Sequence, residues 1–197
     1  MPPVYTVIEA LARPSASKSV RSTGKQQHYY GGVAIIYRSL YKTVKITSLP
    51  KIKSFEYVCI HRYTVRVGDV VVASIYRLGS IVVTSDFFIE LTMFLESLAT
   101  YRCQIILLSD FNIHIERSED IHAKELAELL SSFDIVKHVD EATHNHGGCL
   151  DVVITRSDFA VFDVMVTEVS FSDHCLMTCH LPAIPPVAVE VQVKDRK

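Results

Sequence analysis

The sequence predicts an α/β (α+β) domain in which helices lie against layers of strands, and three observations support this fold class. Segments rich in Val, Ile and Tyr follow one another between Gly31 and Tyr76, a composition typical of strands. After Tyr76, apolar residues recur at helical spacing in two segments separated by an apolar run. Apolar residues make up 49% of the 197 residues and charged residues 21%, which is typical of a globular domain with a sizeable core.

The N-terminal half predicts consecutive strands of an antiparallel or mixed sheet. Residues 4–8 are apolar enough to pair with another strand. Residues 13–28 are rich in Ser, Lys, Arg and Thr, which predicts a solvated, mobile loop. The strands expected after this loop cover residues 33–37, 44–46, 55–62 and 69–76.

The C-terminal half alternates helices with strands. A helix expected over residues 84–98 begins at Thr84 and Ser85, which can cap it. A second helix, expected over residues 119–133, has Ser118 as its predicted N-cap. Further strands are expected at residues 102–108, 152–155, 164–169 and 176–181.

One domain is expected to cover residues 1–181, followed by a tail over residues 182–197 that begins with a proline. The net charge is −2, so no global basic field indicates a nucleic-acid partner. Apolar runs such as Ile105 to Leu108 are far shorter than the roughly 20 residues that cross a bilayer, and no membrane association is expected. Five cysteines without a Cys-x-x-Cys pair indicate buried thiols and an intracellular location.

Polar residues follow the apolar run 105–108 directly. In extended geometry Asp110 and Asn112 would point to the same side of the strand. The C-terminal end of a strand is where α/β folds place ligands, and a carboxylate there can take a proton from water or bind Mg²⁺. A simple turn is the alternative, because Asp and Asn are common where strands end.

Two further polar clusters lie beside expected strands. The segment Ser172-Asp173-His174 offers a hard oxygen ligand next to a group that can donate to a phosphate. Asp151 follows the glycines 147 and 148 and begins an apolar strand. A polar turn is again the alternative for both clusters.

Histidines and cysteines also form two groupings that could bind zinc. They are His144, His146 and Cys149, and His174, Cys175, Cys179 and His180. Neither grouping has the paired short spacings of structural zinc sites, so zinc binding is disfavoured.

Five motifs occur in the order and at the spacing found in one known family. They are Gly31-Gly32-Val33-Ala34, Ile75-Tyr76-Arg77, Asp110-Phe111-Asn112, Thr143 with Leu150-Asp151, and Ser172-Asp173-His174. Over about residues 5–181 the chain resembles the endonuclease/exonuclease/phosphatase family. Within that family it is most similar to the apurinic-type endonuclease domain of non-LTR (LINE-type) retrotransposons.

This resemblance implies a four-layer α/β sandwich, in which two packed mixed β-sheets carry helices on the outside. It implies hydrolysis of a DNA phosphodiester with Mg²⁺ (or Mn²⁺) as the cofactor, by a monomer. A reverse transcriptase domain in the full-length parent protein and a nuclear location are further expectations.

The resemblance also implies a role for each motif residue. Asp110 would activate the attacking water, and Asn112 would orient the phosphate or the metal. His174, paired with Asp151, would contact the scissile phosphate and stabilise its developing charge. Asp173 and Asp110 would bind the metal. Tyr76 would be a catalytic residue whose hydroxyl contacts the phosphate. The residues implied in substrate binding are Arg77, Thr143 and Ser172.

The chain departs from the family pattern at its N-terminus. The family begins with a strand bearing Asn and a segment bearing a metal-binding Glu within Glu-Thr-Trp, whereas this sequence contains no Trp and matches from the following segment. The first strands are therefore expected to be missing, leaving a slot or an exposed strand edge beside Asp110 and Asp173. Fewer anionic ligands would weaken metal binding and activity. Ser109 in place of the usual Gly, and Leu78-Gly79 in place of a Pro pair, indicate relaxed constraint.

Two other functions remain open. One is a phosphatase of the same superfamily acting on inositol lipids or sphingomyelin, although the Tyr-Arg and Leu-Asp motifs favour a nuclease. The other is a non-catalytic, degenerate remnant or interaction domain, which the missing Glu favours.

Overall fold

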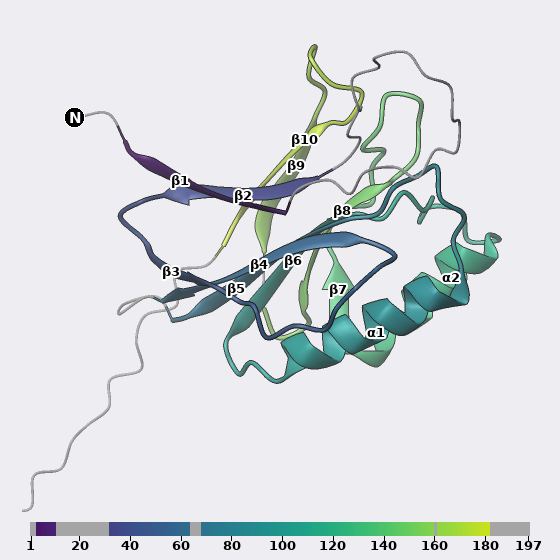
Figure 1. Cartoon of the computed structure of the whole chain (residues 1–197). Coiled ribbons are helices and arrows are strands. Elements are labelled where there is room, and N and C mark those ends of the chain that lie inside the picture. The colour runs from purple at the N-terminus through teal and green to yellow at the C-terminus, as the bar shows by residue number, and fades with distance from the viewer. Residues whose placement is uncertain (1–2, 11–31, 64–67, 160, 182–197) are drawn as a thin grey trace, which may run out of the picture.

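The structure, a computed structural model of the chain, describes residues 3–10, 32–63, 68–159 and 161–181 (Figure 1). Its centre is a mixed six-stranded sheet in which β5 and β6 are parallel and the other neighbours are antiparallel. In spatial order the strands are β3 (Lys42–Lys45), β4 (Glu56–Tyr63), β5 (Val70–Tyr76), β6 (Gln104–Asp110), β8 (Asp151–Arg156) and β7 (Ile135–Lys137). The parallel pair is possible because helix α1 (Ser85–Ala99) returns the chain between its strands.

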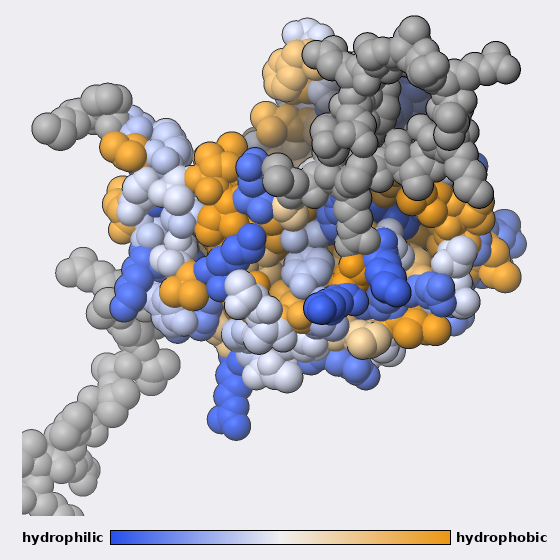
Figure 2. Space-filling model, viewed as in Figure 1, coloured by the Kyte–Doolittle hydropathy of each residue, from blue (hydrophilic) through white to orange (hydrophobic). Residues whose placement is uncertain are grey.

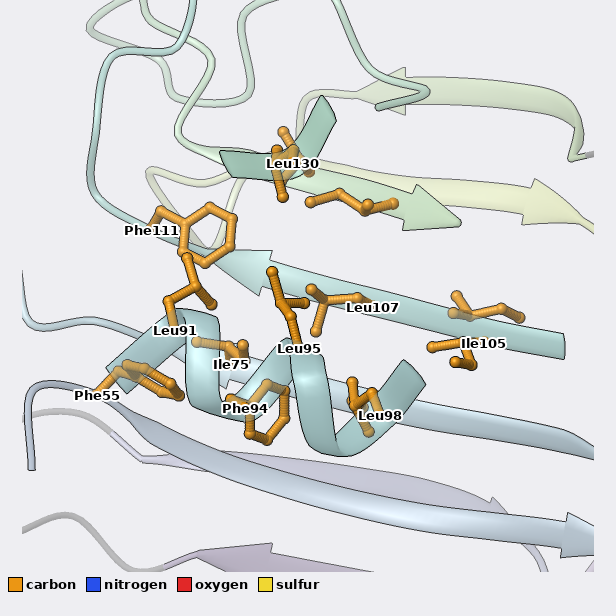
Figure 3. Packing of buried hydrophobic residues seen from close by; sticks show 14 of the residues in the cluster. Phe55, Ile75, Leu91, Phe94, Leu95, Leu98, Ile105, Leu107, Phe111 and Leu130 are labelled. Atoms are coloured by element: carbon orange, nitrogen blue, oxygen red, sulfur yellow. The ribbon is translucent and has the colours of Figure 1, made fainter. Parts of the chain in front are cut away.

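Helices α1 and α2 (Ile121–Ser132) cover one face of this sheet (Figure 1). In α1 the buried residues recur at helical spacing, so one apolar stripe faces the strands. Figure 3 shows Leu91, Phe94 and Leu95 of α1 packed towards Ile75 and Leu107 of the sheet. The core predicted from helical and strand periodicity therefore lies between α1 and the central strands.

Helix α2 begins later than the sequence predicted, and with a different cap. The Asp120 side chain accepts hydrogen bonds from the backbone N–H groups of His122 and Ala123 at 2.8 and 3.0 Å, so Asp120 and not Ser118 is the N-cap. An Asp side chain satisfies the free N–H groups of a first helical turn as well as Ser does, and composition alone does not separate the two.

The second β layer consists of two antiparallel pairs. One pair is β1 (Tyr5–Ala10) with β2 (Val33–Arg38), and it lies over β4 and β5. The other is β9 (Phe162–Thr167) with β10 (Leu176–His180). Among the residues that the structure describes, no strand ladder joins the two pairs, so each pair has unpaired strand edges. The fold class and the mixed main sheet are as predicted, but the second sheet is two separate ribbons and the described helices form one outer layer.

The outer faces of these ribbons are exposed. Side chains of β1 and β2 alternate between partly buried and exposed, and Val7 and Ile36 are 54% and 65% exposed. Figure 2 shows hydrophobic side chains on the surface over β1 and β2. The ribbons therefore contribute one face to the interior, while the main sheet is buried on both faces along β5, β6 and β8.

The remaining element predictions are mostly confirmed. Strands were found at each expected position with ends shifted by at most two residues, and β1 extends the pairing predicted for residues 4–8 to Ala10. The three-residue strand β7 was not predicted, because three residues show no periodicity. The predicted mobile loop at residues 13–28 and the tail at residues 182–197 lie outside the described residues. Neither described helix is long and apolar enough to cross a bilayer.

Candidate active site

Three polar side chains form a row across the end of the main sheet. In the strand register Tyr76 of β5 pairs with Asp110 of β6, and Asp110 pairs with Asp151 of β8. Paired residues on adjacent strands project from the same face of a sheet, so all three side chains share the face opposite the helices. Figure 1 shows the ribbons β1–β2 and β9–β10 on this side of the sheet. Residues far apart in sequence thus meet beneath the second β layer.

Asp110 ends its strand in a tight turn. Asn112 has a positive φ of 50°, and its backbone N–H donates to Asp110 Oδ1 at 3.0 Å. The expectation that Asp110 and Asn112 project together from an extended strand is therefore wrong in its geometry, because the chain leaves β6 at Asp110. The Asn112 carboxamide instead donates from Nδ2 to the carbonyl of Arg77 at 2.8 Å. Asn112 ties the end of β6 to the segment that follows β5.

The side chain of Arg77 holds this turn through hydrogen bonds to its backbone. Its side chain is buried, and the guanidinium donates to the carbonyl oxygens of Phe111 at 2.5 Å, Asn112 at 2.8 Å and Ile81 at 2.6 Å. A buried guanidinium needs this many acceptors, since an unsatisfied charged donor is costly to bury. The geometry directs Arg77 towards the backbone of the Asp110–Asn112 turn.

Gly79 explains one departure from the family pattern. A Cβ atom at this position would lie 2.6 Å from Asn112 Oδ1. Any side chain would displace the Asn112 carboxamide, so a glycine at position 79 is needed for this packing.

Thr143 and Ser172 organise the two loops beside the row. The buried Thr143 hydroxyl accepts hydrogen bonds from the backbone N–H groups of Leu150 and Asp151, both at 3.0 Å. Ser172 Oγ accepts from the backbone N–H of His174 at 3.0 Å. Each hydroxyl therefore closes a local turn next to a predicted catalytic side chain.

His174 reaches the row from the loop between β9 and β10. Its Nδ1 lies 2.8 Å from Asp151 Oδ2, in hydrogen-bond contact. This contact fixes the ring orientation and leaves Nε2 for another partner. Since β8 and the β9–β10 loop belong to different layers, the pair also links the main sheet to the second β layer.

The electrostatics of the row are dominated by burial and crowded carboxylates. Burial, followed by the nearby charge of Asp151, raises the pKa of Asp110 from its ordinary value to about 6. Burial acts to lower the pKa of His174, but the hydrogen bond and charge of Asp151 and the charges of Asp110 and Asp173 outweigh it and raise that pKa. Burial, with the charges of Asp110 and Glu56, raises the pKa of Tyr76. All three pKa values are raised, so the protonated forms of these groups are favoured.

Asp173 projects beside this row and contacts a residue that the sequence analysis did not assign to the site. His144 Nε2 lies 3.5 Å from Asp173 Oδ2. The hydrogen bond from its own backbone N–H is the largest influence that lowers the pKa of Asp173, and the neighbouring charges of His174 and His144 add to it. The sequence offered only the His-rich segment as a signal, because the contact joins residues 29 positions apart. Glu56, which pairs with Tyr76 in the β4–β5 register, was also not assigned.

Two groups in the described part of the chain could hold a cation. Asp110, Asp151 and His174 form one group and His144, Asp173 and His174 the other, each with ligand atoms within 4.8 Å of one another. Carboxylate oxygens are the hard ligands that Mg²⁺ and Mn²⁺ prefer. Burial, followed by the charge of Asp151, raises the pKa of Asp110, and a divalent cation beside these two carboxylates would favour their ionised forms. The donor set therefore fits such a cation, and neither group includes a cysteine.

Comparison with known proteins identifies the fold. No protein-family profile and no curated protein sequence matches the chain. The endonuclease domain of TRAS1, a telomere-specific non-LTR retrotransposon, is similar in structure, with a TM-score of 0.66 and 14% identity over 90% of this chain and 80% of that one. An endonuclease/exonuclease/phosphatase family protein from Leptotrichia buccalis has a TM-score of 0.58 and 14% identity, over 92% of this chain and 73% of that one.

A 3′ phosphatase from Neisseria, solved with a product DNA hairpin, is also similar, with a TM-score of 0.55 and 16% identity over 90% of this chain and 79% of that one. At these identities the comparisons establish the fold. The chain has the fold of endonuclease/exonuclease/phosphatase proteins, and the resemblance predicted from five motifs is confirmed at that level.

Proposed function

We propose that this chain, with the fold shared by these nucleases and phosphatases, is a hydrolase that cleaves DNA phosphodiesters with the help of Mg²⁺ or Mn²⁺. The observation that carries the proposal is the convergence of Asp110, Asp151 and His174 within 4.8 Å, from two strands and a loop of different layers. A carboxylate base beside a carboxylate–imidazole pair can activate water and stabilise the charge that develops on a phosphate ester.

Asp110 is the proposed general base. Its pKa of about 6 lies close to neutral pH, where a base is both largely ionised and strong enough to accept a proton from water. The turn at Asn112 engages Oδ1, which leaves Oδ2 to receive that proton. Arg77 and Asn112 act on the reaction by holding this turn in place.

His174 is the proposed donor to the phosphate. Because Asp151 engages Nδ1, the Nε2–H group is available to a phosphate oxygen as negative charge develops there. The raised pKa of His174 keeps more of the imidazole in its charged form near neutral pH. Tyr76, which lies on β5 beside Asp110, supplies its hydroxyl as a second donor to the phosphate.

Asp173 and Asp110 are the proposed metal ligands, and each belongs to a different one of the two groups that could hold a cation. A bound divalent cation would supply Lewis-acid stabilisation of the phosphate. Thr143 acts by positioning Asp151, and Ser172 acts by positioning His174, so both roles in substrate binding are indirect.

The structural neighbours support DNA as the substrate. The TRAS1 domain is an endonuclease, and the Neisseria 3′ phosphatase was solved with DNA. A mannosyl-6-phosphatase from Bacteroides thetaiotaomicron, with a TM-score of 0.52 and 12% identity over 90% of this chain and 77% of that one, supports hydrolysis of a phosphate monoester as the second candidate. A monomeric state, a nuclear location and a reverse transcriptase partner stay predictions.

The test is nicking of supercoiled plasmid DNA in Mg²⁺, Mn²⁺ or EDTA. We expect weak metal-dependent nicking that Asp110→Asn and His174→Ala each reduce by at least about 100-fold, as expected for loss of a general base or a charge-stabilising donor. Asp163→Asn is the matched control, because Asp163 lies 3.4 Å from His180 in an exposed Asp–His pair at the far end of the β9–β10 ribbon.

Two outcomes would contradict the nuclease proposal. Hydrolysis of a 3′-phosphorylated oligonucleotide or a sugar phosphate without plasmid nicking would establish the phosphatase alternative. No hydrolysis of any of these substrates by a folded protein in either metal would establish the non-catalytic alternative.

A further inference from the structure

We infer that His144 is a positioning residue of this site, whose Nε2–H holds the Asp173 carboxylate while its ring supports His174. The inference rests on the proposed function for its consequence in catalysis. Its structural basis is independent of that function, and it comes from four contacts in the loops that precede β8 and β10.

The backbone around His144 is joined to the loop that carries Asp173 and His174. His144 and His174 form an antiparallel bridge. On its two sides, the N–H of Asn145 donates to the carbonyl of Asp173 at 2.9 Å, and the N–H of Cys175 donates to the carbonyl of Thr143 at 2.7 Å. These contacts join two loops from different layers. They place the His144 Cα opposite that of His174.

The hydrogen bond to Nδ1 sets the tautomer of His144. The backbone N–H of His146 donates to His144 Nδ1 at 3.1 Å. A nitrogen that accepts a hydrogen bond carries no proton, so in the neutral ring the proton resides on Nε2. Asp173 Oδ2 lies 3.5 Å from this Nε2. The hydrogen bond at Nδ1 therefore leaves Nε2 as the donor that faces the carboxylate.

His144 and Asp173 differ in burial, so the more buried His144 is the residue that restrains Asp173. The His144 side chain is 15% exposed, whereas that of Asp173 is 64% exposed. A carboxylate in water on a loop samples several rotamers, and one fixed donor restricts them. Since His144 engages Oδ2, the other oxygen of Asp173 stays available for a cation.

The same ring supports His174. The planes of the two imidazoles are at 85°, with centroids 4.9 Å apart. His174 is thus held by Asp151 at Nδ1 and packed edge-to-face against His144. A single residue fixes both the proposed metal ligand and the proposed phosphate donor.

Direct metal ligation by His144 is the competing role. His144, Asp173 and His174 lie close enough to share a cation. However, Nε2 can bind a metal only if the ring proton moves to Nδ1, where it would face the N–H of His146. The geometry favours a hydrogen-bond donor over a ligand.

The first experiment measures Mn²⁺ binding without substrate, by the electron paramagnetic resonance signal of free Mn²⁺. We expect His144→Ala to weaken binding about 10-fold, the lower end for loss of a group that orients a ligand. His144→Gln places an amide N–H near the Nε2 position and should restore affinity to within about threefold of the wild type. His180→Ala is the matched control and should bind as the wild type does, because His180 lies in an exposed pair with Asp163 at the far end of the β9–β10 ribbon.

The outcomes separate the two roles of His144. Unchanged affinity in His144→Ala, or a wild-type protein that binds no Mn²⁺, would overturn the inference. Loss of more than about 100-fold in both His144→Ala and His144→Gln would indicate direct ligation and would also overturn it.

The second experiment is independent of metal and of catalysis. Long-range ¹H–¹⁵N spectra of the metal-free protein at alkaline pH should show His144 protonated at Nε2 and bare at Nδ1, with the Nε2 signal shifted in Asp173→Asn. An Nδ1–H tautomer would overturn the inference whatever the plasmid assay shows. The expected tautomer in a protein that does not nick DNA would refute the proposed function alone.

Discussion

Asp110 is placed where catalysis and stability make opposite demands. A folded-state pKa above the ordinary value means that the fold favours the protonated carboxyl group. The ionised form that a general base requires therefore costs folding free energy. The cost is fully present above about pH 6, decreases as pH falls through that value, and is absent once the unfolded chain is protonated as well.

This cost predicts the effect of Asp110→Asn in the metal-free protein. At about pH 8 the variant should be more stable than the wild type by on the order of 2 kcal/mol, because the neutral amide carries no charge to bury. Urea denaturation in EDTA checks this, and the difference should disappear by about pH 3 to 4. An equal difference at both pH values would show that charge is not the cause.

Asp151 predicts the titration of His174. Removing its charge and hydrogen bond with Asp151→Asn should lower the pKa of His174, which NMR of the ring carbon-bound protons can follow. A raised imidazole pKa contributes stability below its ordinary value, and this contribution is lost as pH rises through the folded-state pKa. The variant should therefore lose stability mainly at acidic pH. Asp163→Asn should leave the His174 titration unchanged.

At the scale of the element, β6 carries an unfavourable hydroxyl. Ser109 is buried, and within the described residues its Oγ has no hydrogen-bond partner. It lies on the helix-facing side of the strand, one position before Asp110, where the core is apolar. The sequence analysis attributed Ser109 to relaxed constraint, and the buried hydroxyl gives that substitution a physical cost.

Removal of this hydroxyl should stabilise the domain. We expect Ser109→Ala to raise the free energy of unfolding by about 1 kcal/mol, since no partner is left unsatisfied by the change. Ser118→Ala, at an exposed position outside α2, is the control and should have little effect. A less stable Ser109→Ala variant would show that the hydroxyl has a partner in the folded protein.

At the scale of the whole molecule, the two β layers differ in their support. The main sheet has six strands and a helix layer, whereas each ribbon has two strands and exposes one face. Two-stranded pairs are marginally stable without packing on a face. The ribbons also contribute His174 and its loop to the site, so the stability of the site depends on the weaker layer.

Hydrogen exchange should resolve this difference. We expect slow exchange for the amides of residues 105–108 and exchange at least about 10-fold faster for residues 33–37, because local opening of the ribbon is less costly than opening of the main sheet. Equal protection of both segments would show that the second layer is as well supported as the first.

The sequence alone determined most elements and the residue types of the site. Helical spacing in α1 and Val- and Ile-rich strands report burial directly, because burial selects apolar side chains at the period of each element. The motif residues Asp110, Asp151 and His174 were identified in the sequence, and the structure brings them together.

Only the tertiary structure decided how these groups are held. The hydrogen bonds of Arg77 to the carbonyls of Phe111 and Asn112, that of the Asn112 carboxamide to the Arg77 carbonyl, and the contact of His144 with Asp173 join segments that are distant in sequence. Such contacts depend on strand register and on which loops meet, and neither leaves a periodic trace in the chain. The sequence does not show whether an arginine such as Arg77 is buried or binds substrate. Only the carbonyl groups that surround its guanidinium in the fold distinguish the two cases.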